Sequence, residues 1–312
     1  MRDLINRAEV LVEALPFIQR FRGKTFVIKY GGHAMSSAEL IESFARDVVL
    51  LELVGINPVV VHGGGPQISE MIGKMGLQSR FVRGMRVTDA ATMELVEMVL
   101  QRINKEIVAT ISRQGGRAVG LSGKDGDLML SRKMRVMLRD GNGKASAVDV
   151  GLVGEVVEVN QDLIRTLDDA NFIPVIAPVG FDREGQTYNI NADVAAGKLA
   201  AALKAEKLIL MTDVEGIKDK DGALISTLQV AQAKKLVASG VIGEGMIPKV
   251  ECCIDALRDG VAKTHVIDGR VPHAVLLETF TDSGIGTEVV RDEATPAREP
   301  KKKAPRARVR LT

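Results

Sequence analysis

The chain has 312 residues, of which 46% are apolar and 26% charged, and a net charge of +2, so it can bury a large core as one domain or two lobes. It contains no run of about 18 uncharged apolar residues, which excludes a membrane span. Its two cysteines are adjacent, which excludes a disulfide framework, and the absence of tryptophan argues against base-stacking platforms for nucleic acid. We expect a cytoplasmic protein without a signal peptide.

The predicted elements begin with an amphipathic helix over residues 3–18, which has Leu4, Ala8, Leu11, Val12 and Leu15 on one face. Beyond it, short apolar runs typical of buried parallel strands alternate with helical periodicity. The predicted strands are 26–28, 58–61, 118–121, 173–177, 208–211 and 264–267, and the clearest helices are 38–53, 67–75, 90–113, 191–203, 230–238 and 249–259. This alternation predicts an α/β fold with an open, mainly parallel, doubly wound sheet between helices and with ligands at the carboxyl ends of the strands.

The middle of the chain interrupts this alternation. Residues 127–138, a Gly-Asn-Gly turn at 141–143 and residues 152–159 predict an antiparallel excursion. A polar turn within residues 178–186 indicates a lobe boundary. We therefore expect an N-terminal interaction helix (1–22), an N-terminal lobe (23–180), a C-terminal lobe (181–291) and a basic, disordered tail (292–312).

Two glycine-rich turns follow the first two predicted strands: Lys29-Tyr30-Gly31-Gly32 and His62-Gly63-Gly64-Gly65-Pro66. Both predict cradles for phosphate or another anion, because glycine lets the backbone approach a ligand and the N–H groups of the following helix point at it. Neither has the spacing of a P-loop or of a dinucleotide fingerprint. One such turn can be purely structural, but two of them, with a lysine ending the first strand, favour a binding site.

Further candidates lie far along the chain. Arg86, in a glycine-containing loop, suits bidentate capture of a carboxylate, although an isolated arginine is more often in a surface ion pair. Asn189, Asn191 and Asp193 alternate as on one face of an extended segment, and Asn191 also suits a helix N-cap. Lys249 opens a helix against the helix dipole, which predicts an anion beside it.

In chain order these motifs resemble those of the N-acetyl-L-glutamate kinases of the amino acid kinase family, over about residues 2–290. The glycine motifs are shared with related kinases for carbamate, aspartate, glutamate and uridylate, whereas residues 86–89 and 189–193 form a narrower signature. The resemblance implies ATP-dependent phosphorylation of the side-chain carboxylate of N-acetyl-L-glutamate in arginine biosynthesis. Two alternatives stay open: a kinase for a related acidic substrate of the acetylaminoadipate type, and a catalytically silent amino-acid-binding regulator.

The resemblance also implies roles for single residues. Two lysines, Lys29 and Lys249, would face the transferred phosphoryl group from opposite sides, and Asp193 would hold both. Backbone N–H groups would bind nucleotide phosphates at Gly31, Gly32 and Gly64, and the acetylated amino acid would contact Gly64, Gly65, Arg86 and Asn189. Mg²⁺ would arrive with ATP rather than at a protein metal site, and the nucleotide base would lie near residues 212–216.

Two segments resemble arginine-inhibited members of the family. One is the N-terminal helix, which links dimers into a hexamer in those proteins. The other is the C-terminal run in which His265, Glu278 and the backbone near Gly284 would bind L-arginine. We therefore expect a homo-hexamer that L-arginine inhibits and that binds neither a membrane nor nucleic acid. Docking of a nitrogen-signalling protein is left open.

Overall fold

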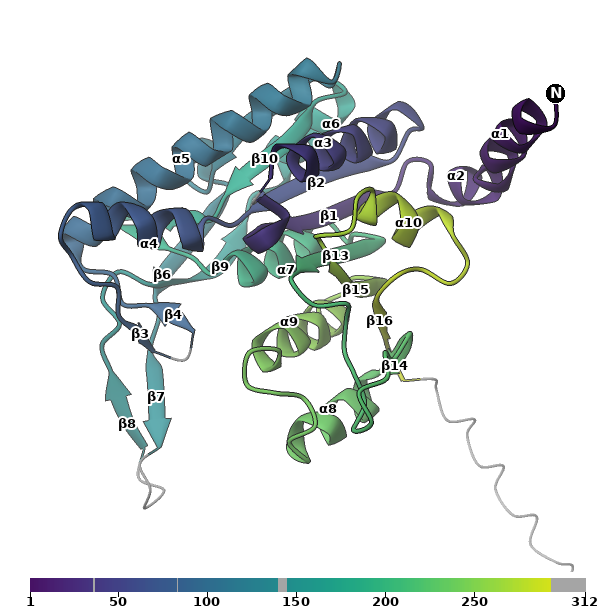
Figure 1. Cartoon of the computed structure of the whole chain (residues 1–312). Coiled ribbons are helices and arrows are strands. Elements are labelled where there is room, and N and C mark those ends of the chain that lie inside the picture. Colours follow the sequence, from purple (N-terminus) through teal and green to yellow (C-terminus); the bar gives the residue numbers. More distant parts are fainter. Residues whose placement is uncertain (36, 83, 140–144, 293–312) are drawn as a thin grey trace, which may run out of the picture.

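The computed structural model describes residues 1–35, 37–82, 84–139 and 145–292 (Figure 1). Its main sheet contains the strands β1 (Thr25–Tyr30), β2 (Asn57–His62), β5 (Ala118–Ser122), β10 (Ile173–Ala177), β13 (Lys207–Thr212), β14 (Thr227–Gln229), β15 (Lys263–Asp268) and β16 (Thr287–Val290). Their order is β14-β16-β15-β13-β1-β2-β10-β5, and of the neighbouring pairs only β15–β16 is antiparallel. The predicted open, mainly parallel sheet is confirmed.

Helices cover both faces of this sheet (Figure 1). One layer consists of α3 (Ala38–Leu53), α4 (Gly65–Lys74), α5 (Ala90–Arg113) and α10 (Ala274–Phe280); the other consists of α6 (Gln161–Asp169), α7 (Ala192–Ala202), α8 (Val230–Ala238) and α9 (Ile247–Arg258). Side chains of β1 alternate between the two cores: Phe26 and Ile28 pack in the first, and Val27 in the second. Because both faces are buried, every position between Thr25 and Lys29 is apolar.

A second sheet adjoins the first at its β10 side. It contains β6 (Met129–Lys133), β9 (Gly154–Val159), β11 (Val179–Phe181) and β12 (Thr187–Asn189), in the order β12-β11-β6-β9. Two hairpins project nearby: β3 (Phe81–Val82) with β4 (Met85–Arg86), and β7 (Val136–Arg139) with β8 (Ala145–Val148). The predicted antiparallel excursion is confirmed, whereas the turn at 141–143 lies outside the described residues.

The N-terminal segment forms two helices instead of the predicted one: α1 (Arg2–Glu13) and α2 (Leu15–Phe21). Pro16 is the reason, because it has no N–H to donate to the carbonyl one turn earlier. The apolar side of α1 does not pack on the body of the protein, since Leu4 is 61% exposed and Leu11 74% exposed. Figure 1 shows α1 extending away from the sheet.

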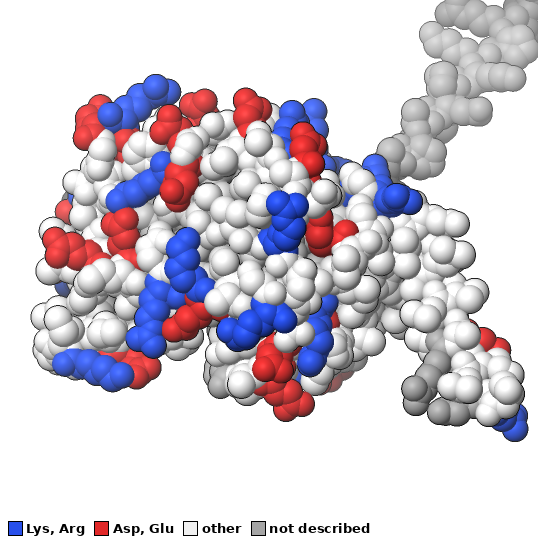
Figure 2. Space-filling view, turned by 90° about the horizontal axis from the view of Figure 1, so that it is seen from above, with Lys and Arg blue, Asp and Glu red and all other residues white. Residues whose placement is uncertain are grey.

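Two predictions about organisation stay predictions. The main sheet runs through residues of both expected lobes, and the fold does not test a boundary at residue 180. All but the first residue of the expected tail, 292–312, lies outside the described ranges. Within those ranges no helix has the length and apolar character needed to cross a bilayer. Figure 2 shows acidic and basic side chains interspersed over the face seen from above, as on an ordinary solvated surface.

Candidate functional site

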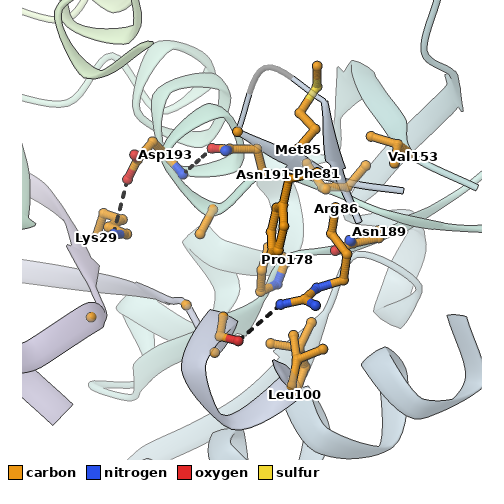
Figure 3. Close-up of a pocket in the computed structure, with 18 residues that line it drawn as sticks. Lys29, Phe81, Met85, Arg86, Leu100, Val153, Pro178, Asn189, Asn191 and Asp193 are labelled. Carbon is orange, nitrogen blue, oxygen red and sulfur yellow. Dashed lines mark hydrogen bonds and ion pairs between the residues drawn. The ribbon is translucent and has the colours of Figure 1, made fainter. Parts of the chain in front are cut away.

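The predicted catalytic side chains meet at the carboxyl end of β1, the central strand. The Nζ atom of Lys29 lies 3.2 Å from Oδ1 of Asp193 (Figure 3). The Nζ atom of Lys249 lies 2.7 Å from the other carboxylate oxygen, Oδ2. One carboxylate thus pairs with two lysines that come from β1 and α9, on either side of α7.

Local sequence places Asp193 in this position. The side-chain oxygen of Asn191 accepts hydrogen bonds from the backbone N–H groups of Asp193 (2.9 Å) and Val194 (3.2 Å), so the predicted N-cap is confirmed. The expectation of an extended segment through Asp193 is wrong, because this cap starts α7 at Ala192. Asp193 therefore lies in the first turn, where the helix dipole favours a carboxylate.

The charge state of the cluster follows from its contacts. Asp193 is only 8% exposed, and burial alone would raise its pKa. The attraction of Lys29 and Lys249 outweighs burial and holds the pKa of Asp193 below its usual value. The carboxylate is therefore ionised, and the three side chains together carry one net positive charge. Such a cluster suits a phosphate-bearing ligand.

Lys249 is the third residue of α9, so its ammonium group opposes the helix dipole. The carboxylate of Asp193 lies beside this ammonium group, and a bound anion at the same helix end stays a prediction. A second ion pair, Lys198 to Asp259 at 3.2 Å, also joins α7 to the end of α9, but its side chains are 41% and 31% exposed. The two helices are thus held together by one buried and one solvated pair.

The two glycine turns lie against each other. The backbone N–H of Gly63 donates to the carbonyl oxygen of Tyr30 at 2.7 Å. A Cβ at Gly31 would lie 3.2 Å from the Gly63 nitrogen, so a larger residue would push the turns apart. Gly32 has φ +66°, in the left-handed region that favours glycine.

Arg86 is buried, not in a surface ion pair. It is 6% exposed, and its Nη2 donates to the Ser69 hydroxyl at 2.8 Å and to the Gly65 carbonyl at 3.1 Å, while Nη1 donates to the Ser79 hydroxyl. The guanidinium carbon lies 4.7 Å from the centre of the Phe81 ring. Burial lowers the pKa of Arg86, but a guanidinium group does not lose its proton in proteins, so the side chain keeps its charge.

Asn189 lies beside Arg86. Its Nδ2 donates to the Thr88 hydroxyl at 3.3 Å, and that hydroxyl donates to the carbonyl oxygen of Arg86 at 2.8 Å. In Figure 3, Arg86 and Asn189 occupy one side of the view, while Lys29 and Asp193 occupy the other. The structure therefore brings the two predicted groups to opposite ends of one site.

A cavity of about 210 Å³ joins these groups. Its lining includes Lys29, Arg86, Asn189 and Asp193 together with Gly32 and Gly63–Gly65, but neither Gly31 nor Lys249. Asp193 is the only carboxylate among the described residues of the lining. Apolar lining comes from Ile68, Phe81, Leu100 and Val153, which the sequence does not distinguish from ordinary core residues.

A second cavity, of about 400 Å³, lies at the end of β13. It is lined by residues 213–219 and 241–243, by Met246 and by Arg270. Of the region predicted to receive the nucleotide base, 212–216, residues 213–216 thus line this cavity and Thr212 does not. Arg270 Nη2 lies 2.7 Å from Asp268 Oδ2.

The predicted effector residues form a third cluster, and none of them lines either cavity. Nδ1 of His265 lies 2.6 Å from Oε1 of Glu278, whose Oε2 accepts from the N–H of Ile285 at 2.7 Å. A Cβ at Gly284 would lie 2.7 Å from the same oxygen. Lys207 is also buried beside this cluster, which nothing in the sequence indicates. Burial lowers the pKa of Lys207 to about 8.

Within the described ranges, no group of three or more histidine, cysteine or acidic residues is arranged to hold a metal ion. Both cysteines are buried, and burial raises the pKa of Cys253 to about 12, so these thiols are not poised as nucleophiles.

Comparison with known proteins gives a consistent result. The model of the amino acid kinase family matches residues 24–268. The acetylglutamate kinase of Geobacter sulfurreducens is 60% identical over 292 residues, which are 93% of this chain and 100% of that protein. Among solved structures, N-acetylglutamate synthase from Neisseria gonorrhoeae, complexed with coenzyme A and N-acetyl-glutamate, has a TM-score of 0.81 at 25% identity. The match covers 92% of this chain but only 64% of the synthase chain.

The same synthase complexed with coenzyme A and L-arginine has a TM-score of 0.77 at 25% identity, covering 91% of this chain and 65% of the synthase. The family model spans most of the chain, and the kinase relative is matched over its whole length. The chain therefore belongs to the amino acid kinase family and, within it, to the acetylglutamate kinases.

Proposed function

We propose that this protein transfers the γ-phosphoryl group of MgATP to the side-chain carboxylate of N-acetyl-L-glutamate, forming an acyl phosphate in the cytoplasmic biosynthesis of L-arginine. The observation that carries the proposal is the cluster of Lys29, Asp193 and Lys249 at one end of a cavity whose other end holds Arg86 and Asn189. The name of the 60% identical relative supports the same substrate.

Lys29 and Lys249 neutralise the phosphates in this proposal. Phosphoryl transfer needs two anions brought into line and the charge on the moving group stabilised, which positioning and electrostatics supply. Lys29, which lines the cavity, contacts the transferred group, and Lys249 contacts the nucleotide phosphates. Asp193 keeps the two ammonium groups at a fixed spacing, because each is paired with a different oxygen of one carboxylate.

Arg86 and Asn189 hold the acceptor. A guanidinium group suits a carboxylate, and the neighbouring amide adds a neutral donor, so together they bind the α-carboxylate of the acetylated amino acid. The side-chain carboxylate then points toward Lys29 at the other end. No general base is needed, because a carboxylate with a pKa of about 4.3 is already ionised near neutral pH.

Glycine N–H groups complete the site. Gly32, Gly64 and Gly65 line the cavity, and donors of this kind stabilise charge that develops on phosphate oxygens. We assign Gly31 to the contact between the turns as well as to phosphate binding. The nucleotide base occupies the second cavity, beside residues 213–219. Mg²⁺ enters with ATP as part of the substrate.

Regulation by L-arginine is the second part of the proposal. Glu278 offers a buried carboxylate for a guanidinium group, beside His265 and the turn at Gly284. The L-arginine complex of the similar synthase supports an arginine site on this fold. The exposed apolar side of α1, with Leu4 and Leu11, packs against α1 of another subunit and links dimers into a hexamer.

A substrate panel tests the proposed reaction. Acyl phosphate, trapped with hydroxylamine, is measured with N-acetyl-L-glutamate, N-acetyl-L-aminoadipate, L-glutamate, L-aspartate and carbamate. N-acetyl-L-glutamate is expected to have the highest kcat/KM by at least about 100-fold. A higher value with aminoadipate, or no product with any acceptor, would contradict the proposal. Titration with L-arginine and light scattering of the full chain test inhibition and the hexamer.

A further inference from the structure

A buried side-chain pair lies directly behind the second glycine turn. His62 is the last residue of β2 and is fully buried, with its Nδ1 2.8 Å from the carbonyl oxygen of Gly63. Its Nε2 lies 3.3 Å from Nδ2 of Asn104, which is also fully buried and comes from the middle of α5. Neither side chain lines the cavity, whereas Gly63 and Gly64 do.

The protonation of His62 follows from its surroundings. Burial lowers the pKa of His62 to about 4, so the imidazole is neutral at physiological pH. A neutral imidazole has one N–H, and a carbonyl oxygen can only accept, so the proton lies on Nδ1 and is donated to Gly63. Nε2 is then the acceptor for the amide of Asn104. One tautomer satisfies both contacts.

Asn104 is itself held from several sides. Its Nδ2 also donates to the carbonyl oxygen of Val175 in β10 at 2.8 Å. A Cβ at Gly120 in β5 would lie 1.9 Å from Oδ1 of Asn104, so only glycine leaves room for this amide. A Cβ at Gly64 would lie 2.8 Å from the side chain of Ile103, the neighbour of Asn104, so α5 also packs closely against the second glycine turn. The amide therefore has one orientation.

These contacts fix the direction of one peptide group. In a trans peptide the C=O of Gly63 and the N–H of Gly64 point in opposite directions, and no peptide bond in the described residues is cis. The hydrogen bond that turns the Gly63 carbonyl toward His62 therefore turns the Gly64 N–H away from it. An N–H that points away from His62 is free to face the cavity, which Gly64 lines and His62 does not.

We infer that His62 and Asn104 are positioning residues, which hold the Gly64 N–H in the orientation that stabilises the transferring phosphoryl group. This inference rests on the proposed kinase reaction. Neither side chain touches a substrate. Their effect is on the chemical step, because the Gly64 donor is most useful where charge develops in the transition state.

The test uses three variants of the full chain. His62→Leu removes the donor to Gly63, and Asn104→Ala removes the partner of Nε2. His62→Asn keeps a donor, because its amide nitrogen reaches the place of Nδ1. Thr110→Val is the matched control, because it also removes a buried polar group from α5. The Thr110 hydroxyl donates to the carbonyl oxygen of Glu106 at 2.8 Å and accepts from Arg113 at 3.0 Å, both within the same helix.

We expect His62→Leu and Asn104→Ala to lower kcat about tenfold to 100-fold, the range found when the hydrogen-bond partner of a metal ligand is removed, with both KM values within about twofold of the parent. His62→Asn should recover most of kcat, and Thr110→Val should keep it. If His62→Leu fails to fold, the kcat of Asn104→Ala decides whether the pair has a positioning role. A folded Asn104→Ala or His62→Leu enzyme with kcat within twofold of the parent would overturn the positioning role alone, whereas a parent that forms no hydroxamate would overturn the proposed reaction.

Discussion

Replacing Asp193 with asparagine removes the charge that holds the two lysines together and keeps the shape of the side chain. Both Nζ atoms contact the same carboxylate, at 3.2 Å and 2.7 Å. They therefore lie within roughly 8 Å of each other, where two unit charges at an effective dielectric constant near 20 repel by about 2 kcal/mol. Without the carboxylate the lysines separate, and restoring their spacing adds this energy to the barrier.

An added barrier of about 2 kcal/mol lowers kcat about thirtyfold. The KM for ATP should not rise, because the site now carries two positive charges instead of one. Initial rates of hydroxamate formation, measured at saturating N-acetyl-L-glutamate over a range of MgATP, separate the two constants. Circular dichroism confirms that the variant is folded.

Asp259→Asn is the matched control for Asp193→Asn. Its carboxylate joins the same two helices through Lys198, but at a solvated position away from the cavity. Exposed pairs contribute about 0–1 kcal/mol, so this variant should keep its kcat. Equal losses of kcat in the two variants would mean that Asp193 acts only by joining α7 to α9. A folded Asp193→Asn enzyme with kcat within twofold of the parent would refute the argument altogether.

Three further predictions concern other parts of the molecule. Arg86→Lys should raise the KM for N-acetyl-L-glutamate at least about tenfold, since a lysine cannot make the bidentate contact, and leave the KM for ATP unchanged; equal shifts of both would contradict the assignment. Glu278→Gln should weaken inhibition by L-arginine about tenfold or more without changing the uninhibited rate, as an arginine titration will show; unchanged inhibition would remove Glu278 from the effector site. Burial, with the charges of Glu52 and Asp169, raises the pKa of Asp168 to about 7, so the folded state binds an extra proton between about pH 4 and 7 and loses stability as the pH rises through this range. Asp168→Asn should therefore be more stable than the parent at pH 8, by about 1 kcal/mol after allowance for solvent screening, and about equal at pH 3.5; urea unfolding at the two pH values measures the difference, and no gain at pH 8 would count against the raised pKa.

The main sheet could be predicted because both of its faces are buried. A strand covered by helices on each side needs apolar residues throughout, and this pattern is visible at 173–177 and 208–211 without any knowledge of the partners. The same pattern stops at Lys29, and a lysine at the end of a buried strand is a local sign of a site. Lys29 and Lys249 could therefore be singled out from local sequence, as could the cap at Asn191, whereas the role of Asp193 came from the family resemblance.

Two of the short helices, α6 and α10, were not predicted, although the nine-residue α8 was. α6 has three apolar residues, Leu163, Ile164 and Leu167, within a charged sequence, and α10 is a seven-residue helix preceded by His273 at φ +58°. The charged residues of α6 leave its apolar period weak, and the seven residues of α10 contain too few turns for a helical period to be distinguished from a loop. The break at Ala14 is different, because Pro16 is visible in the sequence. The apolar pattern continues past this proline, and it therefore predicts one helix instead of two.

Polar contacts between residues far apart in the chain could not be predicted from the sequence either. Asn104 is an amide within the apolar side of α5, which is a visible irregularity, but its partner His62 is 42 residues away. Lys207 begins a strand and looks like an ordinary surface lysine, whereas the structure buries it near Glu278. Such pairs depend on strand order, which local periodicity does not contain.

The most direct test of the central claim is the stoichiometry and the position of phosphoryl transfer. The parent enzyme is incubated with MgATP, N-acetyl-L-glutamate and hydroxylamine, and ADP and hydroxamate are quantified together by mass spectrometry. The proposed reaction predicts one hydroxamate per ADP, located on the side-chain carboxyl group. ADP formed without hydroxamate, or hydroxamate on the α-carboxyl group, would contradict it.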